Sequence, residues 1–306
     1  MTTAPYEVVA SHKKVHKPRR ATRSLWAAIA AVAAEYEVMT VRQLYYQMEM
    51  RGYVGKTEAD YDKIQRACLQ MRRQGELSYD KIVDSSCERR TIYQYSGMRQ
   101  ALEDLHQTYR RNYWLEQPVH LEVWCEKDAL TSIMNPVCQE YGVAFQALRG
   151  FDSESFAYES AKDIKAIGKP AMIYYFGDHD ASGWWIASGL EPQLRSFGAD
   201  ATVLQMGVTP WQVEVMGLPT RRAKTTDSRY RGFVQRFGSD LCTEVDAIPP
   251  NTLEDLIRSC ILRNIDRDAW FRVQREERLE RETLDSLAIA GWLPGMRYGA
   301  PHEVTP

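Results

Sequence analysis

Two short motifs in this chain contain acids at spacings that could bind a metal ion. The first, residues 123–129, places Glu126 directly after an apolar run, and the second, residues 174–183, places Asp178 and Asp180 after another. Because alternate residues of a strand point to the same side, Asp178 and Asp180 are expected to face one way. Both motifs are typical of a strand that ends where a helix begins, the position where ligands gather in open parallel sheets.

Carboxylates from neighbouring strand ends form a hard oxygen site suited to Mg²⁺, and Mn²⁺ is an acceptable substitute. Such a cation polarises a phosphoryl oxygen and neutralises charge on the leaving oxygen. The plainer interpretation is that the acids stand at helix N-termini, where negative charge is favourable anyway. Two such motifs at successive strand ends favour the metal site. His179, between the two aspartates, is expected to point away from the metal.

The elements that must position these acids follow from the hydrophobic pattern. From residue 119 onward, strand-like and helical segments alternate, which predicts an α/β fold with a Rossmann-like parallel sheet and helices on both faces. The expected strands are 119–124, 143–148, 169–176 and 201–206, and the helices between them are 129–141, 153–167 and 183–197. A further strand over 243–248 and helices over 251–265 and 268–287 complete the pattern.

The front of the chain has a different order of elements. Helical patterns over 25–34, 40–51 and 57–74 precede two short alternating stretches, 77–83 and 91–95. Three helices followed by a two-stranded ribbon are the order of a winged-helix domain, a variant of the helix-turn-helix. The resulting plan is a disordered basic arm over 1–23, a winged-helix (α+β) domain over 24–97, a helical connector over 98–118, a metal-binding domain with C-terminal helices over 119–290 and an irregular tail over 291–306.

The charge balance changes near the same boundary. Residues 1–118 hold 19 Lys+Arg against 14 Asp+Glu, a net +5, whereas residues 119–306 hold 20 against 27, a net −7. A basic front that contacts phosphates and an acidic back that gathers a cation would produce this difference, as would uneven solvated surfaces. The residues expected to contact DNA lie in the third helix and the arm: Lys63, Arg66, Arg72, Arg73, Lys13, Lys14, Arg19 and Arg20.

Other features argue against several classes of protein. The chain has no run of 18 apolar residues and no secretory signal, so a membrane protein is not expected. Its six cysteines form no CxxC pair, which favours reduced thiols in the cytoplasm over a zinc site or disulfides. No P-loop sequence is present.

The Glu-Lys-Asp-Ala element at 126–129, followed by Gly-Asp-x-Asp-x-x-Gly at 177–183, resembles the Toprim fold. It is most similar to the A subunit of topoisomerase VI and its relatives, the meiotic double-strand-break transesterases and the stand-alone mini-A proteins. The resemblance spans about residues 40–265 and implies a winged-helix domain followed by a Toprim domain. Ala181 stands where the relatives usually have proline, a change that alters the stiffness of the loop.

The resemblance also implies roles for individual residues. Glu126 and Asp178 would bind Mg²⁺ directly, and Asp180 would support a second metal or its water shell. The family nucleophile is a tyrosine in an Arg-x-(Leu/Ile)-(Tyr/Phe)-Tyr element, which aligns with Arg42 to Tyr46. Arg42 and Tyr46 share a helix face, so Arg42 is expected near the phenolate or the scissile phosphate. The alternative is that Tyr46 is simply a core aromatic residue.

Three later segments have less certain roles. Glu244 and Asp246 are expected to face one way on a strand, where they extend the metal site or, as we favour, serve structure. The basic segment 221–231 is expected to be a loop that either holds the DNA backbone or is merely solvated. Residues 109–114 mix arginines with aromatics, and packing between domains is favoured over strand binding.

The leading hypothesis is a Mg²⁺-dependent DNA-cleaving transesterase in which Tyr46 forms a 5′-phosphotyrosyl link. In this family the tyrosine of one subunit works with the metal of the other, so the resemblance implies a homodimer on double-stranded DNA. ATP-dependent strand passage would need a separate GHKL-type ATPase subunit. The expected location is cytoplasmic and nucleoid-associated, in a prokaryotic, phage or plasmid context.

Two other functions compete with this hypothesis. A hydrolytic Toprim nuclease, acting in defence or for a mobile element, would use the same metal site to activate water instead of Tyr46. A catalytically inactive DNA-binding protein would retain the acids at a desolvation cost, which argues against it. A Toprim primase is disfavoured because no zinc-ribbon cysteines are present.

Overall fold

The computed structural model describes residues 20–83, 94–148 and 154–289. The chain divides into two compact units, one formed by residues 1–88 and 118–265, the other by 89–117 and 266–306. This grouping places the last helix with the helix at 98–108, whereas the domain plan from the sequence assigned it to residues 119–290.

The larger unit is built on a four-stranded parallel sheet, which confirms the predicted α/β class. Its strand order is β4 (Ala144–Ala147), β3 (His120–Cys125), β5 (Ala171–Phe176) and β6 (Ala201–Gly207). The central strand β5 is a continuous apolar run, as expected for a strand covered on both faces, whereas β3 includes the half-buried His120 and Glu122. Cys125 is paired with Phe176, so the residues that follow β3 and β5 emerge side by side at one edge.

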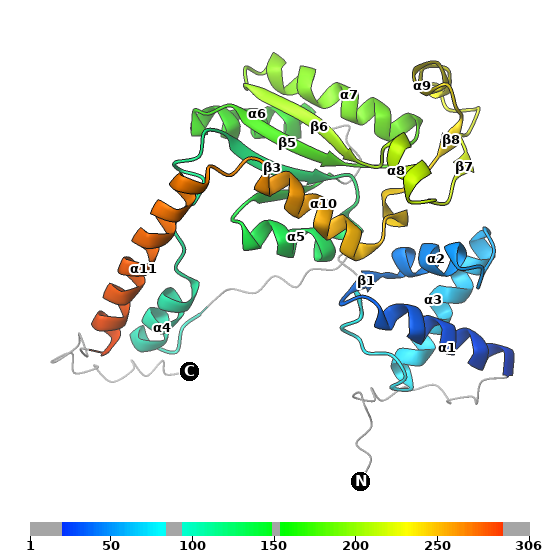
Figure 1. Ribbon diagram of the computed structural model, residues 1–306, viewed down its shortest axis with the longest axis horizontal. Helices are drawn as coiled ribbons and strands as arrows, with labels where there is room; N and C mark the ends of the chain where they lie inside the picture. Colours follow the sequence, from blue (N-terminus) through cyan, green and yellow to red (C-terminus); the bar gives the residue numbers. More distant parts are fainter. Residues whose placement is uncertain (1–19, 84–93, 149–153, 290–306) are drawn as a thin grey trace, which may run out of the picture. The chain divides into compact units, whose positions relative to one another are not determined.

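Helices cover both faces of this sheet (Figure 1). Helices α6 (Glu154–Ile167) and α7 (Ala181–Ser196) lie on one face, and α5 (Thr131–Glu140) and α10 (Pro250–Leu262) lie on the other. Under α6 and α7, fully buried side chains such as Trp124, Tyr175 and Leu190 form one core cluster. Burying each such side chain stabilises the fold by about 1.5–3 kcal/mol, which fixes the strand ends that carry the acids.

Three N-terminal helices belong to the same unit: α1 (Arg20–Ala34), α2 (Val41–Met50) and α3 (Glu58–Arg73). Helix α2 begins at a capping box, in which the Thr40 hydroxyl accepts from the Gln43 amide and the Gln43 side chain accepts from the Thr40 amide. This reciprocal pair satisfies two helix-end donors and sets the direction of α2. Helix α2 also packs against residues 245–247, beside the sheet.

The strand pairing next to these helices differs from the expected ribbon. Strand β2 (Ile82–Val83) pairs in parallel with β1 (Met39–Thr40), which the sequence pattern did not predict. Met39 and Ile82 are both buried, so the pairing closes a small apolar core. The other predicted ribbon strand, 91–95, lies mostly outside the described residues.

Two further segments depart from prediction. The expected strand 243–248 is instead a single bridge at Thr243 followed by the 3₁₀ turn η2 (Val245–Ala247). The Val245 amide donates to the Asp178 carboxylate instead of to a neighbouring strand, which breaks the ladder. The basic segment expected as a loop forms β7 (Arg221–Arg222), which pairs with β8 (Leu241–Cys242), and α9 (Tyr230–Phe237). Helix α8 (Pro210–Val215) and the 3₁₀ turn η1 (Asp128–Leu130) complete this unit.

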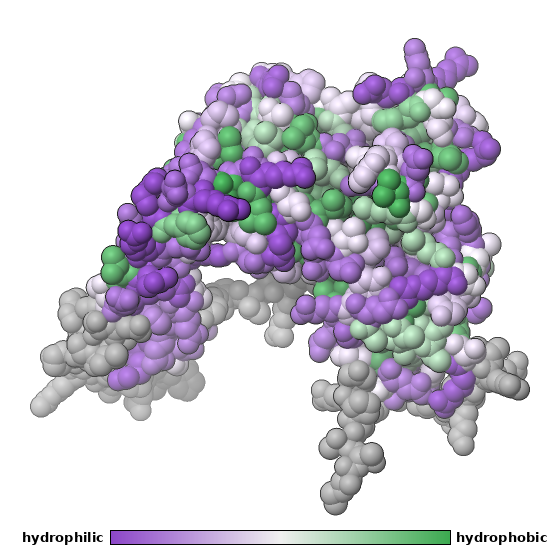
Figure 2. Space-filling model, viewed as in Figure 1, coloured by the Kyte–Doolittle hydropathy of each residue, from purple (hydrophilic) through white to green (hydrophobic). Residues whose placement is uncertain are grey.

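The smaller unit pairs α4 (Met98–Thr108) with α11 (Arg267–Ile289). Tyr113 packs edge-on against Trp270, with ring centroids 4.5 Å apart, and Arg111 pairs with Glu276. The aromatics of 109–114 therefore serve packing within this unit. The face of α11 seen in Figure 2 is mostly hydrophilic. Among all helices in the described ranges, none combines the length and apolarity needed to cross a membrane.

Candidate functional site

Glu126 and Asp178 lie at the carboxyl ends of adjacent strands, as the sequence predicted. The Glu126 amide donates to the Phe176 carbonyl at 2.8 Å, which continues the β3–β5 ladder by one residue. The Asp178 amide in turn donates to Glu126 Oε2 at 3.0 Å. The two acids are therefore held together by backbone as well as by strand register.

Lys127 forms the centre of a charge cluster at this edge. Its Nζ lies 3.1 Å from Asp178 Oδ1, 2.8 Å from Glu244 Oε2 and 2.6 Å from Asp246 Oδ2. Asp246 is 1% exposed, and its second oxygen, Oδ1, is buried without a hydrogen bond. Burial would lower the pKa of Lys127, but the three carboxylates raise it well above its usual value. The ammonium therefore stays charged and joins residues 178 and 244–246.

The two glycines of the second motif are explained by close contacts. A Cβ at Gly183 would collide with the Asp178 carbonyl oxygen, and a Cβ at Gly177 would lie 2.6 Å from the Tyr175 hydroxyl. Asp180 caps α7, since its Oδ1 accepts from the Gly183 amide at 2.7 Å. The spacing of the motif thus brings the start of α7 against Asp178.

The three predicted metal ligands are close but not gathered around one point. Within the described ranges, no three acidic, histidine or cysteine side chains form a ready metal site. Asp180 is engaged in capping α7, and Asp178 Oδ1 already accepts from Val245 and Lys127. Glu126 Oε2 accepts from the Asp178 amide and, at 3.4 Å, from the Tyr175 hydroxyl.

The donor chemistry still fits a divalent cation. Burial raises the pKa of Asp178 to about 7 against the lowering effect of Lys127, and Glu126 adds to the rise. Burial likewise raises the pKa of Glu126, and the Asp180 carboxylate opposes its ionisation. The surroundings of the two carboxylates therefore do not fully compensate their negative charge. Carboxylate oxygens are hard donors, which are the ligands that Mg²⁺ prefers. Glu126 and Asp178 would hold such an ion, with Asp180 as the nearest additional donor.

Tyr46 is buried in α2, with 2% of its surface exposed, and it faces the acidic edge of the sheet. It lines a cavity of about 400 Å³ together with Asp178, Asp180 and Glu244. Burial raises the pKa of the Tyr46 phenol, and a hydrogen bond with Glu244 raises it further, whereas Arg221 opposes the rise. The structure therefore places Tyr46 on the same cavity as Asp178 and Asp180, two of the three predicted metal ligands, whereas Glu126 does not line it.

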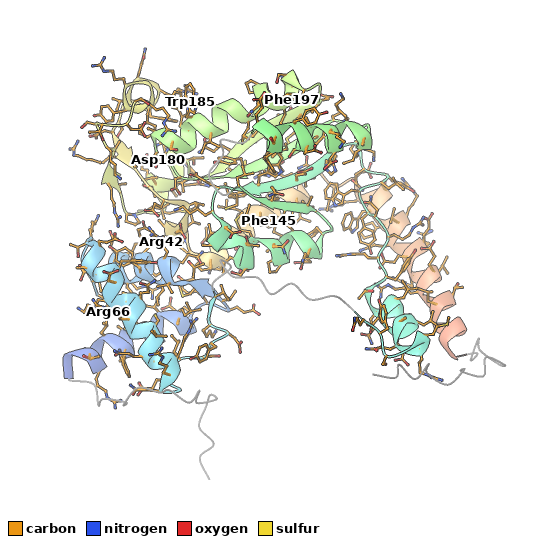
Figure 3. All side chains as sticks on the ribbon, turned by 180° about the vertical axis from the view of Figure 1, so that it is seen from behind. Arg42, Arg66, Phe145, Asp180, Trp185 and Phe197 are labelled. Carbon is orange, nitrogen blue, oxygen red and sulfur yellow. The ribbon has the colours of Figure 1, made fainter. Side chains whose placement is uncertain are left out.

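Arg42, which was expected near the phenol or the scissile phosphate, makes direct contact with Glu244. Its Nη1 contacts both oxygens of Glu244, at 2.9 and 3.2 Å, and its guanidinium lies 4.9 Å from the centre of the Tyr61 ring. It lines a second cavity of about 530 Å³ that Asp178, Glu244 and Asp246 also border. Figure 3 labels Arg42 on α2 and Asp180, which directly precedes α7. Arg42 thus anchors α2 to residue 244.

Arg221 is a cationic side chain that lies beside the Tyr46 ring. Its guanidinium carbon lies 5.6 Å from the centre of the Tyr46 ring, and its Nη2 is 3.5 Å from the Tyr45 hydroxyl and 3.7 Å from Glu49. Arg222 and Lys224 line the same cavity, so basic and acidic side chains both border it. Arginine and lysine side chains are common partners of phosphate oxygens in protein–DNA contacts.

The side chains that were predicted to contact DNA differ in how exposed they are. Lys63 and Arg66 are exposed on α3, where Figure 3 marks Arg66, and Arg73 is half-buried. Arg72 donates to the carbonyls of Tyr79 and Ile82 and therefore fixes the chain that follows α3. Lys13, Lys14 and Arg19 lie outside the described residues, and Arg20 begins α1.

His179 packs away from the acids, as expected. It is 6% exposed and stacks against Phe233 and Phe237, with centroid distances of 5.1 and 4.7 Å. Its backbone amide and carbonyl both bond to Thr243. The residue therefore fixes the loop of Glu244 next to the site.

Sequence reasoning missed four contributors to this site. Lys127 was part of the quoted motif but was given no role, although a lysine directly after a strand-end glutamate is a usable signal. Glu244 and Asp246 were interpreted as structural, and Arg221 as part of a loop. Their partners are between 51 and 202 residues away in sequence, so only the fold reveals them.

No protein-family model matches this chain, and no curated protein matches it at a significant level.

Proposed function

We propose that this protein is a Mg²⁺-dependent DNA-cleaving transesterase similar to the topoisomerase VI A subunit. In this proposal residues 24–97 are a winged-helix domain and the parallel sheet belongs to a Toprim domain. The observation that carries the proposal is the cavity that Tyr46 shares with Asp178 and Asp180. Phosphoryl transfer uses both a nucleophile such as a phenol and carboxylates that hold a divalent cation.

The reaction exchanges one phosphoester for another. The Tyr46 phenol loses its proton, the phenolate oxygen attacks the phosphorus, and the bond from phosphorus to the 3′ oxygen breaks. The products are a 5′-phosphotyrosyl link and a free 3′-hydroxyl, which takes up a proton. The departing proton passes to solvent, because Lys127 and Arg42 lower the pKa of Glu244 to about 2 and this carboxylate is therefore too weak a base to keep it. Mg²⁺ at Glu126 and Asp178 would stabilise the negative charge that develops on the phosphate oxygens.

The cationic side chains divide the remaining work. Arg221 lies over the Tyr46 ring and would favour the phenolate and the bound phosphate. Lys127 and Arg42 both bind Glu244, and the Arg42 contact holds α2 against the acidic edge. Lys63, Arg66 and Arg73 on α3 would contact the backbone of double-stranded DNA.

Partners follow from this chemistry. Cutting both strands of a duplex needs two sites, which a homodimer would provide. Coupling to ATP would need a GHKL-type ATPase from another chain. Such a protein would act on the nucleoid, a phage genome or a plasmid.

A hydrolytic nuclease is the second candidate, and one observation favours it. Tyr46 is almost fully buried and its phenol pKa is raised, so the hydroxyl is a poor nucleophile as it stands. Water at the same metal could then attack the phosphodiester and leave free ends.

Cleavage of supercoiled plasmid separates these candidates. The purified protein is incubated with plasmid and Mg²⁺, stopped with detergent, and compared with Tyr46→Phe and Asp178→Ala. A transesterase gives protein-linked 5′ ends that vanish in both variants. Free ends that persist in Tyr46→Phe but vanish in Asp178→Ala identify the nuclease, and intact plasmid under all conditions contradicts both.

A further inference from the structure

Glu49 is a buried acid to which the proposed reaction gives no role. It lies on α2, three residues after Tyr46, and its side chain is 3% exposed. Neither of its carboxylate oxygens has a hydrogen-bond partner among the described residues. A buried carboxylate without hydrogen bonds costs free energy, so the presence of this acid calls for an explanation other than stability.

Two cationic side chains lie near Glu49. Lys56 Nζ is 3.7 Å from Glu49 Oε1, and Arg221 Nη2 is 3.7 Å from Glu49 Oε2. Both separations fit an ion pair but are too long for a hydrogen bond. Lys56 is 60% exposed and reaches water, whereas Arg221 extends from β7 to lie beside the Tyr46 ring. Arg221 is therefore the side chain through which Glu49 can influence the site.

The hydroxyl of Tyr45 is a second contact for the same guanidinium. It donates to the Gly55 carbonyl at 3.2 Å and accepts from Arg221 Nη2 at 3.5 Å. Burial, and then the charge of Glu49, raise the pKa of the Tyr45 phenol, so it keeps the proton that it donates. Tyr45 and Glu49 are four residues apart and share a face of α2. Together they place the Arg221 guanidinium carbon 5.6 Å from the centre of the Tyr46 ring.

The neighbouring arginine of β7 is held in a different way. Successive residues of a strand point to opposite sides, and Arg222 points to Asp240, whose two oxygens accept from its Nη1 at 2.9 and 2.8 Å. Glu49 instead attracts Arg221 from beyond hydrogen-bond distance. Its charge restrains the guanidinium without taking up the N–H donors that recognise phosphate oxygens.

We infer that Glu49 is a positioning residue: its buried charge, together with the Tyr45 hydroxyl, keeps the Arg221 guanidinium beside the Tyr46 ring, with N–H donors left for a phosphate oxygen. The role of Arg221 toward phosphate rests on the proposed function, whereas the placement of its guanidinium does not. Because Tyr45, Tyr46 and Glu49 lie on one helix, the inference does not depend on which copy of the chain supplies the metal.

The first test does not need cleavage. 3-Fluorotyrosine is placed at position 46 of the full-length chain, and its ¹⁹F resonance reports the charge beside the ring. Arg221→Gln should move this resonance, and Glu49→Gln should move it in the same direction by a similar amount. The double variant should match Arg221→Gln alone, because a residue that acts through another adds nothing once that partner is gone. Lys56→Gln is the control and should leave the resonance at its wild-type position.

Two outcomes would overturn the inference. One is a Glu49→Gln resonance at the wild-type position, and the other is a Glu49→Gln shift that adds in full to that of Arg221→Gln. Glu49→Asp, which keeps the charge, should stay closer to wild type than Glu49→Gln does. Urea unfolding should show Glu49→Gln to be at least as stable as wild type, because both cations near it reach water. A less stable variant with an unmoved resonance would show that Glu49 serves structure alone.

The second test uses supercoiled plasmid and Mg²⁺. The rate at which protein-linked 5′ ends form should fall about tenfold in Glu49→Gln and in Arg221→Gln, and no further in the double variant. Cleavage by Glu49→Gln at the wild-type rate would refute the inference and leave the proposed function standing. The expected fluorine pattern in a protein that cuts no DNA would refute the proposed function and leave the positioning of Arg221 supported.

Discussion

Lys127 neutralises three acids that come from two distant segments of the chain. Asp178 follows β5, whereas Glu244 directly precedes the turn η2 and Asp246 lies within it, and all three contact the same ammonium. Removing a cation from a buried cluster leaves its carboxylates uncompensated, which costs more than the ion pairs themselves contribute. Lys127 is therefore a structural requirement of the site as well as a part of it.

Replacing Lys127 by methionine should destabilise the protein by about 3 kcal/mol, the range found when one partner of a buried ion pair is lost. Urea unfolding followed by circular dichroism measures the change. Lys162→Met is the matched control, since that lysine is 64% exposed and pairs with Glu159 on the surface of α6, where solvent screens the pair and no measurable loss is expected. Equal stabilities of the two variants would contradict this role.

Glu244 gives the protein a defined response to acid. Burial alone would raise the pKa of this carboxyl, but Lys127 and then Arg42 lower it to about 2, below its ordinary value of 4.5. A group whose folded-state pKa is depressed stabilises the fold above its unfolded pKa, and that stability is lost as the pH falls toward the folded value.

The stability advantage of wild type over Glu244→Gln should therefore be constant above about pH 5 and shrink steadily between pH 4.5 and pH 3. Urea midpoints of both proteins across this range provide the measurement. An advantage that does not change with pH would show that the charge of Glu244 contributes nothing.

At the level of elements, hydrophobic periodicity predicted most of the sheet and its helices. The strands β3, β5 and β6 and the placement of Glu126 and Asp178 at adjacent strand ends follow from local pattern alone. The turn η2 could not be predicted this way, because its shape depends on a side chain 67 residues earlier, Asp178, which accepts from the Val245 amide. The pairing of β1 with β2 was missed for the same reason, since two residues carry no period.

Substitutions at two glycines of helix α7 test why the second motif, residues 177–183, ends in a glycine. Gly183→Ala should disturb the site, because the added methyl group collides with the Asp178 carbonyl, and a loss of about 2 kcal/mol with weaker metal binding is expected. Gly189→Ala, in the same helix with open space around it, should instead stabilise by about 0.5–1 kcal/mol. Thermal unfolding of both variants measures these changes in stability. A Gly183→Ala variant as stable as wild type would mean that the Asp178 carbonyl does not lie against residue 183.

For the whole molecule, the acidic edge should link stability to divalent cations. A ligand that binds only the folded state at 100 times its Kd stabilises by about 2.7 kcal/mol, which corresponds to a rise in Tm of roughly 4 °C for a chain of this size. Thermal scans with Mg²⁺ and with a chelator measure this rise. It should disappear in Asp178→Ala, and an equal rise in that variant would place the cation elsewhere.

The basic front part and the acidic back part of the sequence both contribute side chains to the cavity. The basic side chains Arg221, Arg222 and Lys224 border the cavity from the acidic part of the chain, while Tyr46 comes from the basic part. The net charges of the two parts of the chain therefore differ, but they do not show where these parts come into contact. That contact is made by α2 and residues 244–246, which no sequence pattern connects.

The central claim is that Tyr46 becomes covalently joined to DNA. The most direct measurement is mass spectrometry of the protein after reaction with a short duplex and Mg²⁺, followed by nuclease and protease digestion. The claim predicts that the peptide containing Tyr46 carries a nucleotide joined through its 5′ phosphate, and that Arg221→Gln lowers its yield at least tenfold. Cleaved DNA with free 5′ phosphates and an unmodified Tyr46 peptide would contradict it.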